Sequence, residues 1–234
     1  MVIYGRNPVH EALRGRRRVH RIWATKNAGR EGWLAGAGVP VEVASAEEIA
    51  ERSGSDGHQG VCAEADPYPY VGAAELLAVP DAFLVALDEV TDPQNLGAVA
   101  RTAETAGATG LVIPERRSAE VTPAVCKASA GAVEHLRIAR VRNLADFLGE
   151  AKAAGAWTYG AAAQASTPYR QPDYSGKVVL VLGAEGRGLR PRVAAACDDL
   201  VALPMHGQVG SLNVSAAAAV LMYEILHQRL DTGT

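Results

Sequence analysis

The feature of this chain that most limits its fold is an alternation of short apolar runs with helix-like segments, which continues from residue 83 to residue 230. The run VVLVL at residues 178–182 contains no polar residue, as expected for a strand that is buried on both faces. Strands that alternate with helices favour a mostly parallel sheet covered by helices on both faces. We therefore predict an α/β fold here, with strands at 83–87, 110–113, 137–141, 157–161, 178–182 and 200–203, and helices at 95–106, 122–133, 144–154, 190–196 and 213–230.

The first 66 residues predict a separate, smaller α/β domain. Asn7 is a candidate N-cap and Pro8 suits a first helical position, so we expect a helix that ends near Arg14. A capping-box pattern, Ser-Ala-Glu-Glu, predicts a second helix that begins at Ser45. The remaining expected elements are strands at 19–24, 41–43 and 61–65 and a short helix near 30–37.

A boundary between the two parts is predicted by the prolines of the segment DPYPY at residues 66–70. Proline cannot continue a helix or a central strand, because it lacks the backbone N–H. We expect a small domain at 1–66, a linker at 67–80 and a larger domain at 81–234.

The net charge of −3 hides an uneven distribution. Residues 1–30 hold eight basic side chains and one acidic one, a net of +7, whereas the other 204 residues hold 15 basic and 25 acidic ones, a net of −10. Most cations are arginines, which suit phosphate recognition but would also be common in a protein from a GC-rich genome. The basic start indicates RNA contacts, for which the candidates are Arg6, Arg16, Arg17, Arg18 and Arg21.

Other classes of protein fit the composition poorly. No stretch is long and apolar enough for a membrane span, and no signal-peptide core is present, so the cytoplasm is the expected location. The three cysteines, Cys62, Cys126 and Cys197, lie far apart without a Cys-x-x-Cys pair. This spacing argues against a disulfide framework and against a zinc site, so no metal is expected.

Three polar blocks follow predicted strands, where ligands bind in parallel α/β folds. They are NLGAVART (95–102), LGAEGRGL (182–189) and LPMHGQVGSLNVSAA (203–217). Each block alone also has a purely structural interpretation, since Asn95, Ser211 or Asn213 could cap a helix and the glycines could form a tight turn. The glycine order G-x-x-G-x-G is not the dinucleotide fingerprint G-x-G-x-x-G, and no Gly-Lys-Ser/Thr follows.

Taken together and in this order, the three blocks resemble the motifs of the SpoU, or TrmH-type, branch of the SPOUT RNA methyltransferases. YGRNPVHEAL (4–13) and HQGV (58–61) resemble the small substrate-binding domain of members that modify ribosomal RNA, a domain similar to the ribosomal protein L-thirty-e fold. The resemblance implies a parallel sheet with a deep trefoil knot in the C-terminal half, and a homodimer that completes the RNA site. It also implies transfer of a methyl group from S-adenosyl-L-methionine to a ribose 2′-hydroxyl, with guanosine of large-subunit ribosomal RNA favoured.

The resemblance also implies roles for individual residues. Arg101 takes the position of the proposed base, although an arginine resists deprotonation; the alternative is that Arg101 holds a substrate phosphate. Asn95, Glu185, Ser211 and Asn213 match positions that orient Arg101 or the ribose. The implied cofactor contacts come mainly from backbone, at Gly183, Leu203 and Leu212, with Leu182, Ala184, Gly186 and Met205 nearby.

Several alternatives remain open at this point. The same chemistry could act on tRNA or on an antibiotic-resistance site of ribosomal RNA. A catalytically silent RNA-binding module is a second possibility, against which the intact polar positions of the three blocks argue. An oxidoreductase that uses a dinucleotide is disfavoured by the glycine order and by the late position of the glycine loop.

Overall fold

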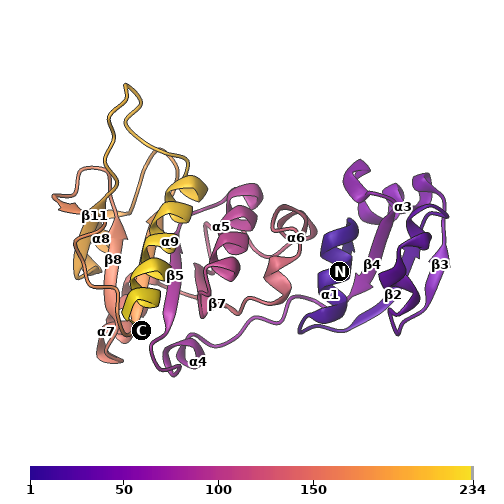
Figure 1. Ribbon diagram of the computed structural model, residues 1–234, viewed down its shortest axis with the longest axis horizontal. Helices are drawn as coiled ribbons and strands as arrows, with labels where there is room; N and C mark the ends of the chain where they lie inside the picture. The colour runs from indigo at the N-terminus through magenta and orange to yellow at the C-terminus, as the bar shows by residue number, and fades with distance from the viewer. Residues whose placement is uncertain (233–234) are drawn as a thin grey trace. The chain divides into compact units, whose positions relative to one another are not determined.

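The computed structural model describes residues 1–232, which divide into two compact units. The first unit comprises Met1–Pro69 together with Glu120–His135, and the second comprises Tyr70–Ala119 and the chain from Leu136 onward (Figure 1). None of the helices among these residues is long and apolar enough to cross a membrane.

The first unit is built on a sheet with the strand order β1-β4-β2-β3. β1 and β2 each pair with β4 in antiparallel fashion, and β3 lies parallel to β2. The predicted strands and the capping box of α3 are confirmed, with the Ser45 hydroxyl accepting a hydrogen bond from the Glu48 amide at 3.2 Å. The elements are β1 (Val2–Tyr4), α1 (Arg6–Arg14), β2 (Val19–Ala24), η1 (Ala28–Arg30), α2 (Gly32–Ala35), β3 (Val41–Val43), α3 (Ala46–Ser53), η2 (Asp56–His58) and β4 (Val61–Ala65).

The N-cap predicted for α1 is wrong. The helix begins at Arg6 with Gly5 as its N-cap, and Asn7 lies within the first turn. Gly5 has φ 98°, a left-handed value that favours glycine, so the chain turns into the helix two residues earlier than the Asn-Pro pattern indicates.

The segment Glu120–His135 belongs to the first unit, although it lies between strands of the second in the sequence. It carries α6 (Pro123–Ala128), which begins after its cap Thr122 as predicted, and the 3₁₀ turn η3 (Ala132–Glu134). The helix expected at 122–133 is wrong beyond Ala128, because Ala130 and Gly131 have φ of 52° and 90° and break it. A buried ion pair joins it to the turn after α1, because the Arg17 Nε donates to Glu134 Oε2 at 2.9 Å and the Arg17 Nη2 also bonds Glu134 Oε1. The sequence pattern gave no sign of this pairing.

The second unit is built on a sheet with the order β7-β6-β5-β10-β8-β11-β9, in which every pairing is parallel. The α/β prediction is therefore confirmed, while α4 and β9 have no counterpart among the predicted elements. The elements are α4 (Ala73–Leu77), β5 (Phe83–Asp88), α5 (Pro93–Thr105), β6 (Gly110–Pro114), β7 (Ile138–Val141), α7 (Leu144–Ala153), β8 (Trp157–Ala161), β9 (Thr167–Pro168), β10 (Val178–Gly183), α8 (Pro191–Ala196), β11 (Asp199–Ala202) and α9 (Val214–Thr232).

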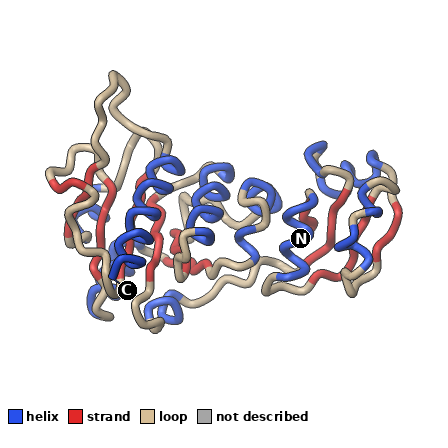
Figure 2. Tube along the Cα trace, viewed as in Figure 1, coloured by secondary structure: helices blue, strands red, loops and turns tan. Residues whose placement is uncertain are grey.

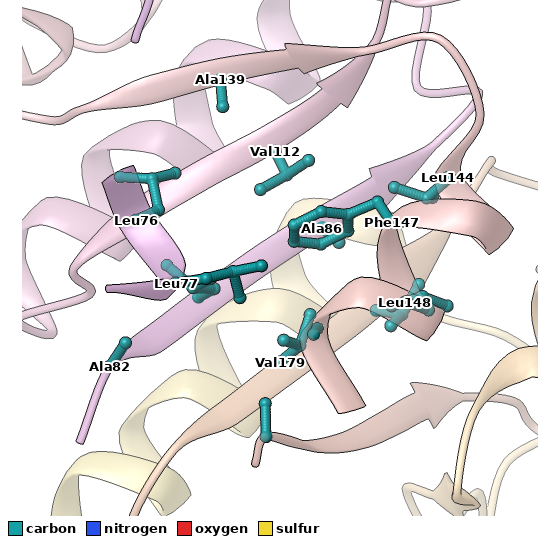
Figure 3. Packing of buried hydrophobic residues seen from close by; sticks show 14 of the residues in the cluster. Leu76, Leu77, Ala82, Ala86, Val112, Ala139, Leu144, Phe147, Leu148 and Val179 are labelled. Carbon is teal, nitrogen blue, oxygen red and sulfur yellow. The ribbon is translucent and has the colours of Figure 1, made fainter. Parts of the chain in front are cut away.

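Both faces of this sheet are covered by helices (Figures 1 and 2). On one face, Phe147 and Leu148 of α7 pack on Val112 and Val179 of the strands (Figure 3). The other face is covered by α5 and α9, which pack against each other. Successive side chains of a strand point to opposite faces, so β10 needs apolar residues throughout, as its sequence predicts.

From β5 the chain first adds β6 and β7 on one side of this strand, and it then places β8, β9, β10 and β11 on the other side. The direction in which strands are added therefore reverses between β5 and β10. Clefts for ligands form at the carboxyl ends of strands at such a switch point. Asp88 and Gly183 are paired in register there, so the first two polar blocks emerge side by side.

Candidate active site

Three of the expected catalytic side chains meet at this switch point. The Asn95 amide nitrogen donates to Glu185 Oε2 at 3.3 Å, and the Asn213 amide nitrogen donates to the same oxygen at 3.2 Å. The Asn213 nitrogen also donates to the Asn95 amide oxygen at 3.0 Å. Residues from all three polar blocks therefore form one hydrogen-bonded group, which we call the amide–carboxylate cluster (Asn95, Glu185 and Asn213).

Asn213 is oriented by the helix that follows it. Its side-chain oxygen accepts hydrogen bonds from the Ser215 amide at 2.8 Å and the Ser215 hydroxyl at 2.6 Å, at the start of α9. This use of the oxygen leaves the nitrogen to face Asn95 and Glu185. The predicted capping role and the predicted site role are thus both present in one side chain.

Asn95 does not cap α5, so the purely structural interpretation of this residue as a helix cap is wrong. Asp92 is the N-cap, with its carboxylate accepting from the Gln94 amide at 3.0 Å, and Pro93 occupies the first helical position. Asn95 consequently lies in the first turn and points its side chain to the cluster.

Arg101 and Ser211 lie outside the cluster's hydrogen bonds. Arg101 is exposed six residues after Asn95 in α5, and within residues 1–232 its side chain has no hydrogen bond or ion pair. Ser211 is exposed in the loop before α9, on the wall of the cavity described next. Both side chains are thus available to a ligand.

A cavity of about 350 Å³ adjoins the cluster. Glu185 lies on its wall, and every residue expected to contact the cofactor lines it: Leu182, Gly183, Ala184, Gly186, Leu203, Met205 and Leu212. The sequence reasoning missed a third contributing loop after β8, which could have been found by the same strand-end rule. The last residue of β8, Ala161, and the loop residues Ala162, Ala163 and Gln164 line the cavity.

The donor set of the cavity fits S-adenosylmethionine. Apolar side chains such as Leu203, Met205 and Leu212 offer a surface for an adenine ring, and the glycine loop exposes backbone N–H and C=O groups for its polar edges. The only ionisable side chains on the wall, among the described residues, are Glu185 and Arg187. S-adenosylmethionine carries both positive and negative charges, so backbone N–H and C=O groups together with one acidic and one basic side chain suit it.

The glycines of the second block are required by its backbone. Gly186 and Gly188 have φ of 76° and 67°, and the Gly188 amide donates to the Ala184 carbonyl at 2.9 Å, which closes a tight turn. A Cβ at Gly183 would overlap the backbone of Gly188. The G-x-x-G-x-G order therefore encodes a turn that brings bare backbone to the cavity wall.

The arginines expected to bind RNA differ in their availability. Arg16 and Arg18 are exposed, and within the described chain their side chains have no partner. Arg6 pairs with Glu31 at 2.8 Å and Arg21 with Glu42 at 3.2 Å, but both remain about half exposed.

Arg17 cannot serve as an RNA contact, which corrects the expectation. Its side chain is 1% exposed, and its guanidinium is bonded to Glu134. Desolvation by burial acts to lower the pKa of Arg17, but the hydrogen bond to Glu134 and the charges of Cys126 and Glu134 together raise that pKa above its usual value. In the sequence, Arg17 differs in no way from its neighbours Arg16 and Arg18.

Comparisons with known proteins agree with this geometry. The profile of the SpoU rRNA Methylase family matches residues 82–223. The profile described as RNA 2′-O ribose methyltransferase substrate binding matches residues 2–71.

One relative is the 23S rRNA (guanosine-2′-O-)-methyltransferase RlmB of Pseudomonas syringae pv. tomato, 40% identical over 244 residues, with 97% of this chain and 95% of that protein covered. The SpoU methyltransferase AviRb from Streptomyces viridochromogenes, solved with its cofactor AdoMet (S-adenosylmethionine), superposes with a TM-score of 0.83 at 25% identity, covering 98% of this chain and 90% of that one. The TrmH/SpoU tRNA modifying enzyme of A. aeolicus superposes with a TM-score of 0.59 at 28% identity, covering 69% of this chain and 82% of that one. The chain therefore belongs to the SpoU rRNA methylase family and is an S-adenosylmethionine-dependent RNA 2′-O-ribose methyltransferase.

Proposed function

We propose that this chain methylates the 2′-hydroxyl of a guanosine ribose in large-subunit ribosomal RNA, in the cytoplasm. The observation that carries the proposal is the amide–carboxylate cluster beside a cavity whose lining fits S-adenosylmethionine. Ribosomal RNA is favoured over tRNA because the RlmB relative aligns over both units, whereas the tRNA modifying enzyme covers 69% of the chain.

The residues that line the cavity would hold the cofactor through the glycine loop at 183–188 and the loop before α9. When bound, S-adenosylmethionine supplies a methyl group activated by a positively charged sulfur. The protein's contribution is then to exclude water and to present one ribose hydroxyl to that methyl group, since positioning supplies a large part of such a rate.

We assign the amide–carboxylate cluster to holding the ribose. Each amide already donates to Glu185 or Asn95, so the three side chains support one another and need little reordering when RNA binds. Ser211, on the cavity wall, offers a hydroxyl that can both donate to and accept from the substrate.

We assign Arg101 to the phosphate beside the target ribose. A guanidinium keeps its proton at neutral pH, so Arg101 serves better as a donor to an anionic oxygen than as a base. The phosphate that it holds can receive the proton that leaves the 2′-hydroxyl, and the bound guanidinium stabilises the negative charge that forms on the nucleophile.

A homodimer with a deep trefoil knot in the second unit completes the proposal. Apolar side chains are exposed along one side of α9 and in the loop before it, which is typical of a protein interface. They are Val209, Leu212, Val220, Tyr223 and Leu230, each between 43% and 74% exposed. Light scattering of the purified chain should give twice the mass of 24.5 kDa.

The direct test is a map of ribose methylations on total RNA from cells with and without this gene. We expect one guanosine methylation to disappear from large-subunit ribosomal RNA in the deletion strain. Loss of a tRNA methylation instead would assign the chain to tRNA, and an unchanged map would indicate a silent RNA-binding module.

The role of Arg101 is tested with the purified protein. Arg101→Ala should bind S-adenosylmethionine as the unchanged protein does, because Arg101 does not line the cavity, but should lose methyl transfer. Gln94→Ala, an exposed change in the same helix, is the matched control and should leave both properties unchanged. Near-normal turnover of Arg101→Ala would remove this residue from the mechanism.

A further inference from the structure

A second hollow of the same unit is lined by arginines. It measures about 320 Å³ and lies where β6 and β7 end and α8 begins. Among the described residues, its wall carries Arg116, Arg117, Arg142, Arg190 and Arg192, together with Pro114, Asn143, Ala145 and Val193. We call it the arginine hollow; in the part of the chain that the structure describes, no acidic and no aromatic side chain lines it.

The position of Arg190 in this hollow is set by a buried carboxylate. Asp88, fully buried at the end of β5, accepts from the Arg190 Nε at 2.7 Å and from the Arg190 backbone amide at 2.8 Å. Glu89 lies 3.5 Å from Arg190 and 3.4 Å from Arg117, between the two guanidinium groups. Arg190 is therefore held in place before any ligand arrives, which lowers the entropy cost of binding, whereas Arg117 is 77% exposed and has only the long contact to Glu89.

The other three arginines have fewer restraints. Arg192 pairs with Asp146 at 2.9 Å, a contact in which both side chains are exposed. Arg116 and Arg142 are exposed, and no hydrogen bond or ion pair of their side chains occurs within residues 1–232. The hollow thus holds an excess of positive charge that the protein itself does not neutralise.

A third hollow, of about 550 Å³, lies between the arginine hollow and the amide–carboxylate cluster and shares wall residues with both. Arg117 lies on the walls of both hollows. Asn95 and Glu185 of the amide–carboxylate cluster line the third hollow as well, and Glu185 also lines the cofactor cavity. A continuous surface therefore runs from the cofactor cavity past the cluster to the arginine hollow.

We propose that the arginine hollow binds backbone phosphates of the substrate RNA that flank the methylated nucleotide. The proposal rests on the RNA substrate of the proposed function and adds a docking site to it. Arginine forks match phosphate oxygens, and a wall without aromatic side chains offers bases nothing to stack on, so the backbone is the part of RNA that fits. Such contacts fix the register of the RNA and carry no sequence information.

The test uses the full chain with Arg116 and Arg142 both changed to glutamine, since within residues 1–232 these two side chains have no hydrogen bond or ion pair. Binding of an unmodified transcript of large-subunit ribosomal RNA is measured at several salt concentrations. Loss of two phosphate contacts should weaken binding roughly 10-fold or more at 0.1 M salt and lower the salt slope by about 1 to 2 units. The KM for RNA should rise while S-adenosylmethionine binding, measured by calorimetry, stays unchanged.

Arg170→Gln is the matched control, because it removes an exposed arginine of the same unit outside the hollow and should leave RNA affinity unchanged. Unchanged affinity and salt slope in the double variant would overturn the proposal, as would an equal loss in the control. If the double variant also lost cofactor binding, the Arg116→Lys/Arg142→Lys protein would be measured instead, because it keeps both positive charges. This protein must keep most of the salt slope if the charges act on phosphate, and loss of the slope would overturn the proposal. RNA binding is read without methyl transfer, so a failure of the hollow is distinct from a failure of the proposed reaction.

Discussion

The buried ion pair between Arg17 and Glu134 should dominate the stability of the first unit. In Glu134→Gln the shape is kept, but the amide nitrogen faces guanidinium N–H groups and one of the two accepted hydrogen bonds is lost. The remaining partners of Arg17 are neutral, namely the Asp66 carbonyl at 3.2 Å and two sulfur atoms, so the cation is left uncompensated where its side chain is 1% exposed. Removing one partner of such a pair costs about 3–5 kcal/mol, a large share of the stability of a typical domain.

Urea unfolding followed by tryptophan fluorescence measures this loss. In a Trp157→Phe background the remaining tryptophans, Trp23 and Trp33, report only on the first unit. Glu51→Gln, an exposed change in α3, is the control and should cost less than about 0.5 kcal/mol. Replacing both partners by apolar residues, as in Arg17→Met/Glu134→Leu, should recover most of the loss. A cost below about 1 kcal/mol for Glu134→Gln would refute the reasoning that an uncompensated buried charge is created.

Three further outcomes are expected. Gly183→Ala should lower the affinity for S-adenosylmethionine by calorimetry, because its Cβ would displace the backbone of Gly188; unchanged affinity would show that the turn is not part of the site. Arg16→Gln/Arg18→Gln should flatten the salt dependence of RNA binding, and an unchanged slope would mean that these exposed side chains do not contact phosphate. Burial raises the pKa of the Cys62 and Cys126 thiols to about 11 and that of the half-buried Cys197 to about 12, so at pH 8 only about 0.1% or less of each is thiolate and native alkylation should be slow. Rapid alkylation of Cys62 or Cys126, seen by mass spectrometry, would contradict their burial.

Much of the fold could be predicted because its signals are local. The apolar run of β10 predicts a strand buried on both faces, and the Ser45 box predicts the start of α3. The polar blocks could be placed at one edge of the sheet because parallel strands end there together, and the contact of Asn95 with Glu185 bears this out.

The errors arise where a partner distant in the sequence decides the structure. Arg17 reads as one of three equivalent surface cations, and only Glu134, 117 residues away, distinguishes it. The assignment of Glu120–His135 to the first unit depends on the packing of α6 and η3 against β1 and α1, which no local pattern signals. Helix α4, within the segment expected to be a linker, is only five residues long and is stabilised by burying Leu76 and Leu77.

The distribution of charge along the sequence is a poor guide to where RNA is bound on the surface. The basic start of the chain, a net of +7 over 30 residues, loses Arg17 to the interior and engages Arg6 and Arg21 with carboxylates. The remainder of the chain carries a net charge of −10, yet the ends of β6 and β7 and the start of α8 gather arginines around one hollow. Phosphate responds to charges within about a Debye length, roughly 10 Å at 0.1 M salt, and not to the total of a segment. The topology of the sheet, which brings strand ends together, therefore determines the local field at the site more than composition does.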